Sequence, residues 1–279
     1  MSDIIIDDPT EIAPTETALI QPKEDPLRIF IGYDTKEKIA YEVLKYSIEE
    51  KTKVPVKIIP LYHKELRRQG FFKRPWLINA LDGNNTDMID GKGFSTEFSH
   101  TRFLVPALMK FNGWALFMDC DMLVRCDIRE VFAHCDDRYA VMCVKHNQKV
   151  TRPEKMDGSQ QVSYYRKNWS SFMLINCGHY LNRKLTIDTV NLATGGWLHG
   201  FGWLPDTAIG GLPNYYNWIE GTSPGMTFPR VIHYTMGGPW FDGYGSVFFA
   251  EDWWKAYEKF HEMLPMPNAQ LTDINYSDL

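Results

Sequence analysis

The pattern of apolar and polar positions predicts alternating strands and helices from about residue 27 onward. A continuous apolar run over 27–34 predicts a buried strand. Apolar positions at helical spacing follow over 36–50, and a β-branched run over 54–62 predicts a second strand. Strand, helix and strand in this order indicate a right-handed βαβ unit. The fold class is therefore α/β, with a mixed, mostly parallel sheet.

The same pattern predicts further elements along the chain. Helices are expected over 95–111, 127–132, 185–194 and 251–263, the third ending at a Gly-Gly pair. Strands are expected over 114–118, 122–124, 139–144 and 170–177, with another immediately before His233. The stretches 64–93 and 145–167 lack periodicity and are interpreted as surface loops. A basic group in the first loop could contact phosphate, but its pattern is more typical of a solvated face: Arg67, Arg68, Lys73 and Arg74.

The two ends of the chain differ in composition from the middle. Residues 1–26 are rich in Asp, Glu, Thr and Pro and are expected to form a disordered arm. The folded domain is expected over 27–264, and 265–279 is expected to be a loose tail. No apolar run is long enough to span a bilayer, and the N-terminus lacks the pattern of a signal peptide. Five cysteines without a Cys-x-x-Cys pair favour reduced thiols and a cytoplasmic location.

Charge and aromatic content narrow the choice of ligand. The net charge of −5 provides no global basic field for nucleic acid. Aromatic residues make up 14% of the chain, which is enough for a rigid core or for surfaces that stack on sugar-like ligands.

The strongest local signal is an acidic pair at the end of a predicted strand. Asp119 and Asp121 flank Cys120, directly after the apolar run 114–118 and before a second apolar run, 122–124. Ligands of open α/β sheets bind at strand ends, and two carboxylates there suit a divalent metal whose other ligands are phosphates. The alternative is a pair of solvated turn aspartates, against which the apolar flanks argue.

The end of the first strand carries a second candidate group. Gly32 lets the backbone approach a ligand, while Tyr33 and Asp34 can stack on a base and accept a hydrogen bond from it or from a ribose hydroxyl. The Gly-rich dinucleotide fingerprint is absent, so an ordinary strand end is an equal alternative.

Several separated segments, in one order, resemble the retaining GT-A glycosyltransferases of glycosyltransferase family 8. The sequence Thr-Arg-Phe-x-x-Pro ending at Pro106 resembles the family's helix before its metal motif, and 116–128 resembles its DXD segment. The segments 170–176 and 204–206 resemble a strand ending in Asn and the start of a Pro-Asp-Gln-Asp motif. Residues 233–240 resemble its C-terminal His-x-x-Gly-x-x-Lys-Pro-Trp motif.

The resemblance implies a single GT-A domain that moves a hexose from a UDP-sugar to an acceptor hydroxyl, with retention of configuration. Asp119, Asp121 and His233 are then expected to hold Mn²⁺, with Mg²⁺ possible, against the diphosphate. Backbone N–H groups of the turn at Gly237 and Gly238 are expected to face phosphate. Two further residues are expected to contact the donor sugar: Arg102 and Asp206.

The sequence also departs from the family pattern. Thr207 and Ala208 stand where Gln and Asp are usual, Trp169 stands where Asn is common, and the Lys before the final Pro-Trp is missing. Candidate replacement cations are Lys145, Lys155, Arg166 and Lys167. The resemblance implies an acceptor that is a saccharide, a lipid-linked sugar or another hydroxyl compound, and the sequence leaves open which of these it is. Six aromatic residues could stack on the sugar faces of the acceptor, with core packing as the alternative: Trp197, Trp203, Tyr215, Tyr216, Trp218 and Trp240.

Two other functions are consistent with parts of this pattern. A sugar nucleotidyltransferase of similar fold normally carries a Gly-rich basic loop after its first strand, and residues 32–35 do not form one. A non-catalytic sugar-binding module would keep the aromatic residues and would not need the metal.

Overall fold

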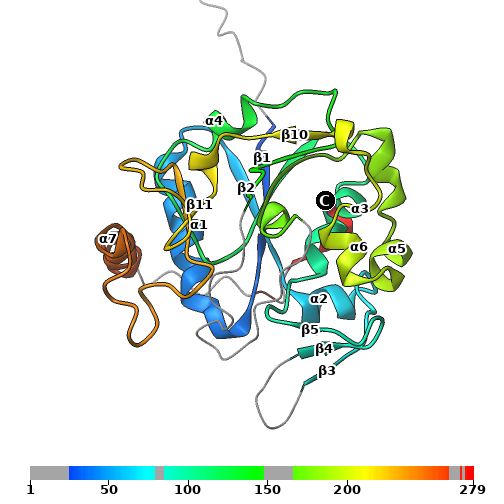
Figure 1. The fold of residues 1–279 in the computed structure, drawn as a ribbon, viewed down its shortest axis with the longest axis horizontal. Coiled ribbons are helices and arrows are strands. Elements are labelled where there is room, and N and C mark those ends of the chain that lie inside the picture. Colours follow the sequence, from blue (N-terminus) through cyan, green and yellow to red (C-terminus); the bar gives the residue numbers. More distant parts are fainter. Residues whose placement is uncertain (1–24, 79–84, 148–165, 264–270, 272–273) are drawn as a thin grey trace, which may run out of the picture.

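The computed structural model describes residues 25–78, 85–147, 166–263, 271 and 274–279. The predicted N-terminal arm therefore lies almost entirely outside the described residues. At the centre is a six-stranded sheet in the order β10-β8-β9-β6-β1-β2 (Figure 1). Its strands are β1 (Leu27–Gly32), β2 (Val56–Leu61), β6 (Trp114–Met118), β8 (Val141–Cys143), β9 (Phe172–Asn176) and β10 (Ile209–Gly211).

The direction of the strands confirms the predicted fold class. β1 runs parallel to β2 and β6, and β10 runs parallel to β8. β9 is antiparallel to both of its neighbours, β6 and β8. The sheet is therefore mixed and mostly parallel within an α/β fold.

The central strands read as continuous apolar runs because both faces of the sheet are covered. Helix α1 (Lys38–Lys51) joins β1 to β2 and lies on the same side as α7 (Ala250–Glu262) (Figure 1). Three short helices lie on the other side: α3 (Val105–Leu108), α5 (Ile187–Leu192) and α6 (Gly195–His199). Phe30 in β1 and Phe117 in β6 are paired across the sheet and fully buried.

A smaller sheet extends the core beside the acidic motif. It has the order β11-β12-β7, with β7 (Met122–Val124), β11 (Trp218–Ile219) and β12 (Val231–His233). Its side chains form a second apolar cluster with Val43 of α1 and Trp253 of α7, both fully buried. The strand predicted before His233 is thus present, and α7 matches the predicted terminal helix.

Residues 64–93 form more structure than the sequence predicts. They contain the end of α2 (His63–Arg68) and a three-stranded sheet of β3 (Trp76–Ile78), β4 (Asn85–Asp87) and β5 (Gly93–Phe94). The prediction that Arg74 is solvated is wrong: it is fully buried, with Nη2 at 2.6 Å from Oδ2 of Asp87. A buried guanidinium is tolerated because an equally buried carboxylate pairs with it.

The helix predicted over 95–111 is also wrong in length. The chain instead forms the 3-10 helix η2 (Thr101–Leu104) and the short helix α3 (Val105–Leu108). Pro106 lies at the start of α3, where its missing N–H is tolerated, whereas it would break a bond inside a longer helix. Lys110 and Phe111 have φ values of 51° and 55°, which end the helical turn.

The remaining helices are short. They are α4 (Arg129–Phe132), α5 (Ile187–Leu192) and α6 (Gly195–His199). The Gly195-Gly196 pair begins α6 instead of ending the preceding helix, because the Thr194 side chain caps α6 by accepting from the Trp197 N–H. None of the helices in the described part of the chain has the length and apolar character needed to cross a bilayer.

The C-terminal tail is not loose where the structure describes it. Tyr276, in the 3-10 helix η8 (Tyr276–Asp278), is 1% exposed. Its hydroxyl donates to the Pro60 carbonyl at 2.6 Å and accepts from the Tyr62 N–H at 3.1 Å. These bonds fix residues 274–279 against the end of β2.

Gly32 at the end of β1 is required by packing. A Cβ atom at this position would lie 2.2 Å from the ring of Phe98, which is itself buried. We expect Gly32→Ala to lower the free energy of unfolding by about 1–3 kcal/mol, the usual cost of overpacking a core. Urea denaturation measures this change.

Gly211→Ala is the matched control, because Gly211 also lies in a central-sheet strand and a Cβ there meets nothing within 4 Å. The control should unfold close to the wild-type midpoint. Equal midpoints for the two variants would contradict the packing explanation.

Candidate active site

Two sheets bring the predicted metal ligands together. Asp119 follows β6 and Asp121 precedes β7, so the two carboxylates lie on the turn that connects the sheets. His233 ends β12, which pairs antiparallel with β7 in a register that places His233 opposite Met122. The Tyr234 N–H donates to the Asp121 carbonyl at 2.9 Å and fixes the end of this pairing.

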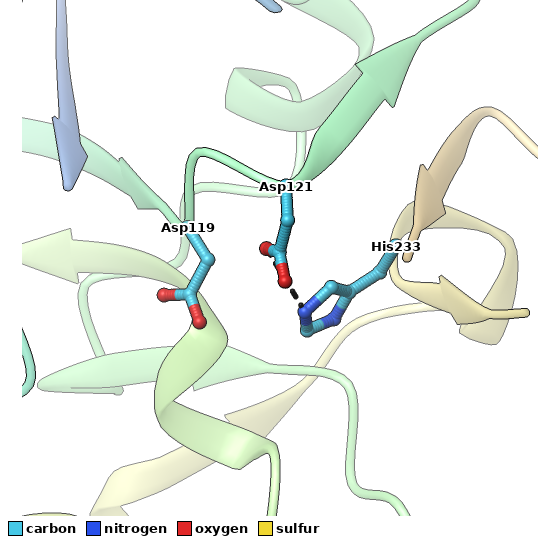
Figure 2. A group of neighbouring side chains, drawn as sticks. All are labelled: Asp119, Asp121 and His233. Carbon is cyan, nitrogen blue, oxygen red and sulfur yellow. Dashed lines mark ion pairs between the residues drawn. The ribbon is translucent and has the colours of Figure 1, made fainter. Parts of the chain in front are cut away.

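The three side chains point toward one another (Figure 2). One ligand atom from each of Asp119, Asp121 and His233 lies within 4.8 Å of the others. Nε2 of His233 is 3.3 Å from Oδ1 of Asp121, and it has no hydrogen-bond partner among the described residues. Two carboxylates and a buried imidazole with an available nitrogen fit a divalent ion of the Mn²⁺ or Mg²⁺ type.

Arg102 lies against this group, but its described contacts differ from the predicted ones. Nη1 is 2.9 Å from Oδ1 of Asp119 and donates to the Ser170 carbonyl at 2.9 Å. The guanidinium also lies over the rings of Phe98 and Phe117, at 5.2 and 5.0 Å. Arg102 is 5% exposed, so its positive charge is buried beside the Asp119 carboxylate. The pairing orients this carboxylate and offsets part of the free-energy cost of burying it.

Cys120, between the two aspartates, is fully buried and donates through Sγ to Oε2 of Glu37 at 3.3 Å. Burial, followed by the nearby Glu37 carboxylate, raises the pKa of the Cys120 thiol well above its ordinary value. The thiol is therefore protonated at neutral pH and does not act as a thiolate ligand. Its hydrogen bond ties the acidic turn to the start of α1.

The two residues expected to bind the nucleotide after β1 are buried and contact other parts of the chain. Tyr33 was predicted to stack on a base, but its ring is a core side chain, 4% exposed and packed edge-on against Tyr41 and Tyr62. Asp34 is 3% exposed, and its two oxygens accept the N–H groups of Lys36 at 2.8 Å and Glu97 at 2.9 Å. Burial raises the pKa of Asp34, and the two N–H donors oppose that shift.

The Gly-Gly turn after His233 is shaped by its neighbours. Gly237 has a φ of 129°, which favours glycine, and its N–H donates to the Tyr234 carbonyl at 2.8 Å. A Cβ at Gly238 would lie 2.0 Å from the ring of Trp240. The Gly237 N–H predicted to face phosphate is thus engaged within the turn.

Asp206 lies at the start of the 3-10 helix η5 (Asp206–Ala208), with its side chain 81% exposed. It forms an ion pair with Nη2 of Arg166, whose Nη1 donates to the Gly200 carbonyl at 2.7 Å. Arg166 also lies 5.2 Å from the ring centre of Trp169, and Lys145 lies 5.8 Å from the same ring. Two candidate replacement cations therefore gather around Trp169, while the candidate Lys155 lies outside the described residues.

The aromatic residues predicted to meet an acceptor divide into two groups. Trp203, Tyr216 and Trp218 are each 3% exposed and are core side chains, so they are not available for stacking in this structure. Partly exposed members of the set are Trp197, Tyr215 and Trp240.

Sequence reasoning missed Asn217, which contacts His233 directly. It is fully buried, and its Oδ1 lies 2.9 Å from Nδ1 of His233. The only signal in the sequence is one polar residue within the aromatic and apolar run 215–219.

Solved structures of glycosyltransferases share this architecture. The bifunctional glycosyltransferase WbbM matches with a TM-score of 0.55 and 14% identity, over 86% of this chain and 52% of WbbM. The galactosyltransferase LgtC, solved with donor and acceptor sugar analogues, matches with a TM-score of 0.50 and 12% identity, over 84% of this chain and 96% of LgtC. GlyE of Streptococcus pneumoniae matches with a TM-score of 0.51 and 12% identity, over 85% of this chain and 63% of GlyE. The chain therefore has the GT-A fold, and it spans about half the length of WbbM.

Sequence similarity identifies the family. No protein-family model matches the sequence. Protein CDI of Arabidopsis thaliana is 41% identical over 245 residues, which cover 86% of this chain and 89% of Protein CDI. The chain belongs to the family of Protein CDI.

Proposed function

We propose that this protein is a metal-dependent glycosyltransferase that moves a hexose from a UDP-sugar to an acceptor hydroxyl with retention of configuration. One observation carries the proposal: Asp119, Asp121 and His233 converge at a strand end of a GT-A fold, with ligand atoms within 4.8 Å of one another. The likeness to LgtC, a galactosyltransferase solved with donor and acceptor sugar analogues, supports the same reaction class.

The proposed metal is Mn²⁺, or Mg²⁺, held by Asp119, Asp121 and His233. When bound, such an ion offsets the negative charge that builds up on a departing diphosphate. Arg102 keeps the Asp119 carboxylate oriented toward the site through its 2.9 Å contact. The apolar strands around the motif exclude water and so strengthen these charge interactions.

The donor is proposed to lie between this centre and Asp206. Asp206 is the proposed acceptor of hydrogen bonds from the sugar hydroxyls, and its ion pair with the buried Arg166 fixes its position. Arg166 and Lys145 are the proposed replacements for the missing lysine. The backbone at Gly32, the Asp34 carboxylate and the Gly237-Gly238 turn remain proposed contacts of the nucleotide.

The proposed catalytic unit is one domain over residues 27–264, to which residues 274–279 are added because Tyr276 packs against the end of β2. Its acceptor is a saccharide, a lipid-linked sugar or another hydroxyl compound that stacks on the partly exposed aromatic residues. All five cysteines are free, which supports the proposed cytoplasmic location.

Product analysis tests the proposal against its two rivals. The purified protein is incubated with a panel of UDP-hexoses and Mn²⁺, with and without saccharide acceptors, and the released phosphates are identified. We expect UDP release that stops when EDTA removes the metal and returns when Mn²⁺ is added. Pyrophosphate formation from UTP and a sugar phosphate would identify a nucleotidyltransferase instead. Sugar binding without any turnover would identify a non-catalytic module.

A further inference from the structure

Asn217 connects His233 to the rest of the candidate site. It follows the 3-10 helix η6 (Asn214–Tyr216) and precedes β11, whose parallel pairing with β12 brings it beside His233. The Asn217 side chain is fully buried, and the His233 residue is 1% exposed. Water therefore does not compete for the 2.9 Å contact between Oδ1 of Asn217 and Nδ1 of His233.

The surroundings of the Asn217 amide decide which way it points. Its nitrogen lies 2.9 Å from Oγ of Ser171 and 3.4 Å from the carbonyl oxygen of Asn168. The Ser171 hydroxyl donates to that same carbonyl at 2.8 Å, so Oγ is an acceptor toward Asn217. Two acceptors on one side require the NH₂ group there, and the amide oxygen must face His233.

The orientation of the amide fixes the protonation of the imidazole. An amide oxygen can only accept, so Nδ1 of neutral His233 carries the proton and Nε2 keeps its lone pair. Nε2 is the atom that lies 3.3 Å from Oδ1 of Asp121. The imidazole therefore presents its basic nitrogen to the ligand cluster.

Ser171 extends the same network to the backbone of Asp119. It lies in the 3-10 helix η3 (Trp169–Ser171), and its carbonyl accepts the Asp119 N–H at 2.9 Å. The Ser171 hydroxyl contacts Asn217, and its backbone contacts Asp119. One residue thus couples the positions of the acidic turn and of His233.

We propose that Asn217 is a positioning residue that selects the tautomer and ring orientation of His233 and so sets the metal affinity of the cluster. The proposal rests on the metal site of the proposed function. Groups that hydrogen-bond the second nitrogen of a metal-binding histidine change metal affinity by about 10–100-fold when removed. Asn217→Ala is therefore expected to weaken Mn²⁺ binding by about 10–100-fold.

The test is a titration of the purified full chain with Mn²⁺, without donor, by isothermal calorimetry, alongside thermal unfolding of each variant. Asn182→Ala is the matched control, because Asn182 is also fully buried and bonds to the Ala140 and Asn176 carbonyls and to Trp203. The control should lose stability and keep its Mn²⁺ affinity.

Asn217→Asp separates positioning from folding. A carboxylate still accepts from Nδ1 of His233 but loses the donors to Ser171 and Asn168, so stability should fall while Mn²⁺ affinity is kept. Wild-type affinity in Asn217→Ala, or an affinity loss in Asn217→Asp equal to that in Asn217→Ala, would overturn the proposal. If Asn217→Ala binds normally while Asp121→Ala does not bind, the metal site stands without this role. If the wild-type chain itself does not bind Mn²⁺, the proposal and the proposed function fail together.

Discussion

Asp121→Ala is expected to lower metal-dependent UDP release by about 10³-fold. Charge stabilisation by a metal ion contributes several kcal/mol to such reactions, and each ~1.36 kcal/mol corresponds to a factor of ten in rate. Asp121 is 3.3 Å from His233 and lies on the same turn as Asp119, so its loss removes the central member of the ligand set. Initial rates of UDP release with saturating donor and Mn²⁺ measure the effect.

Asp136→Ala is the control for the change in charge, because Asp136 is a surface residue paired with the exposed Arg138. It should turn over at the wild-type rate. Added Mn²⁺ should not restore turnover in Asp121→Ala, because Asp119 and His233 alone do not hold the ion in place. Full metal-dependent turnover in this variant would show that the metal binds elsewhere.

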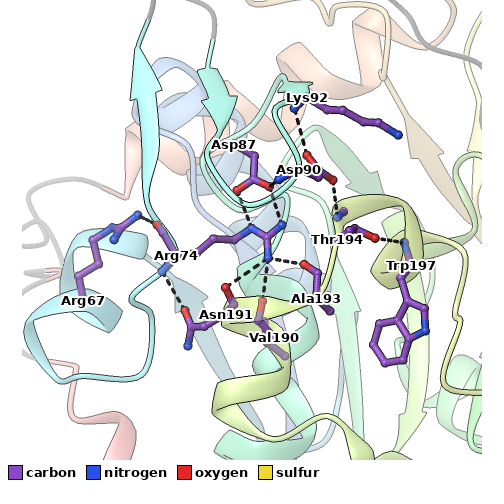
Figure 3. A network of polar contacts seen from close by, with 11 residues as sticks. Arg67, Arg74, Asp87, Asp90, Lys92, Val190, Asn191, Ala193, Thr194 and Trp197 are labelled. Carbon is purple, nitrogen blue, oxygen red and sulfur yellow. Dashed lines mark hydrogen bonds and ion pairs between the residues drawn. The ribbon is translucent and has the colours of Figure 1, made fainter.

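Asp87→Ala is expected to lower the free energy of unfolding by about 3–5 kcal/mol, the cost of breaking one half of a buried ion pair. Arg74 is fully buried and Asp87 is 2% exposed, and Nε and Nη2 of Arg74 meet the two Asp87 oxygens at 2.8 and 2.6 Å (Figure 3). The guanidinium also donates to the Val190 and Ala193 carbonyls at the end of α5. Removing the Asp87 carboxylate leaves the buried positive charge of Arg74 with only neutral carbonyl groups as partners.

Urea denaturation measures this loss, and Arg138→Ala provides the comparison. The Arg138–Asp136 pair has side chains 78% and 28% exposed, so solvent screens it and no measurable change is expected. If Asp87→Ala unfolds at the wild-type midpoint, the Arg74 pair does not hold the β3-β4-β5 sheet against α5.

The acidic motif illustrates what local pattern can predict. An apolar run of five residues before Asp119 indicated a buried strand, and β6 occupies those positions. The strand ahead of His233 and the terminal helix were found in the same way, because burial of both faces leaves a continuous apolar run and burial of one face leaves a periodic pattern. The convergence of Asp119, Asp121 and His233 followed from family resemblance, since no local pattern states that β12 pairs with β7.

Other features could not be predicted because their partners are distant in sequence. Arg74 looked solvated because Asp87, thirteen residues away, joins it only after β3 and β4 pair. Tyr33 looked available for stacking because the rings of Tyr41 and Tyr62 reach it only through the βαβ unit. The helix predicted over 95–111 was overextended because apolar spacing does not distinguish the 3-10 helix η2 followed by the short helix α3 from one continuous helix.

The sequence by itself determined the α/β class and the central strands, because periodicity and residue type are local properties. Its resemblance to a known family, and not local pattern, brought His233 together with the two aspartates. The tertiary structure alone decided the partners of the charged and polar groups: Arg102 on Asp119, Arg166 on Asp206, and Asn217 on His233. A buried polar atom needs a partner within about 3 Å, and only the packing of distant elements fixes which one it finds.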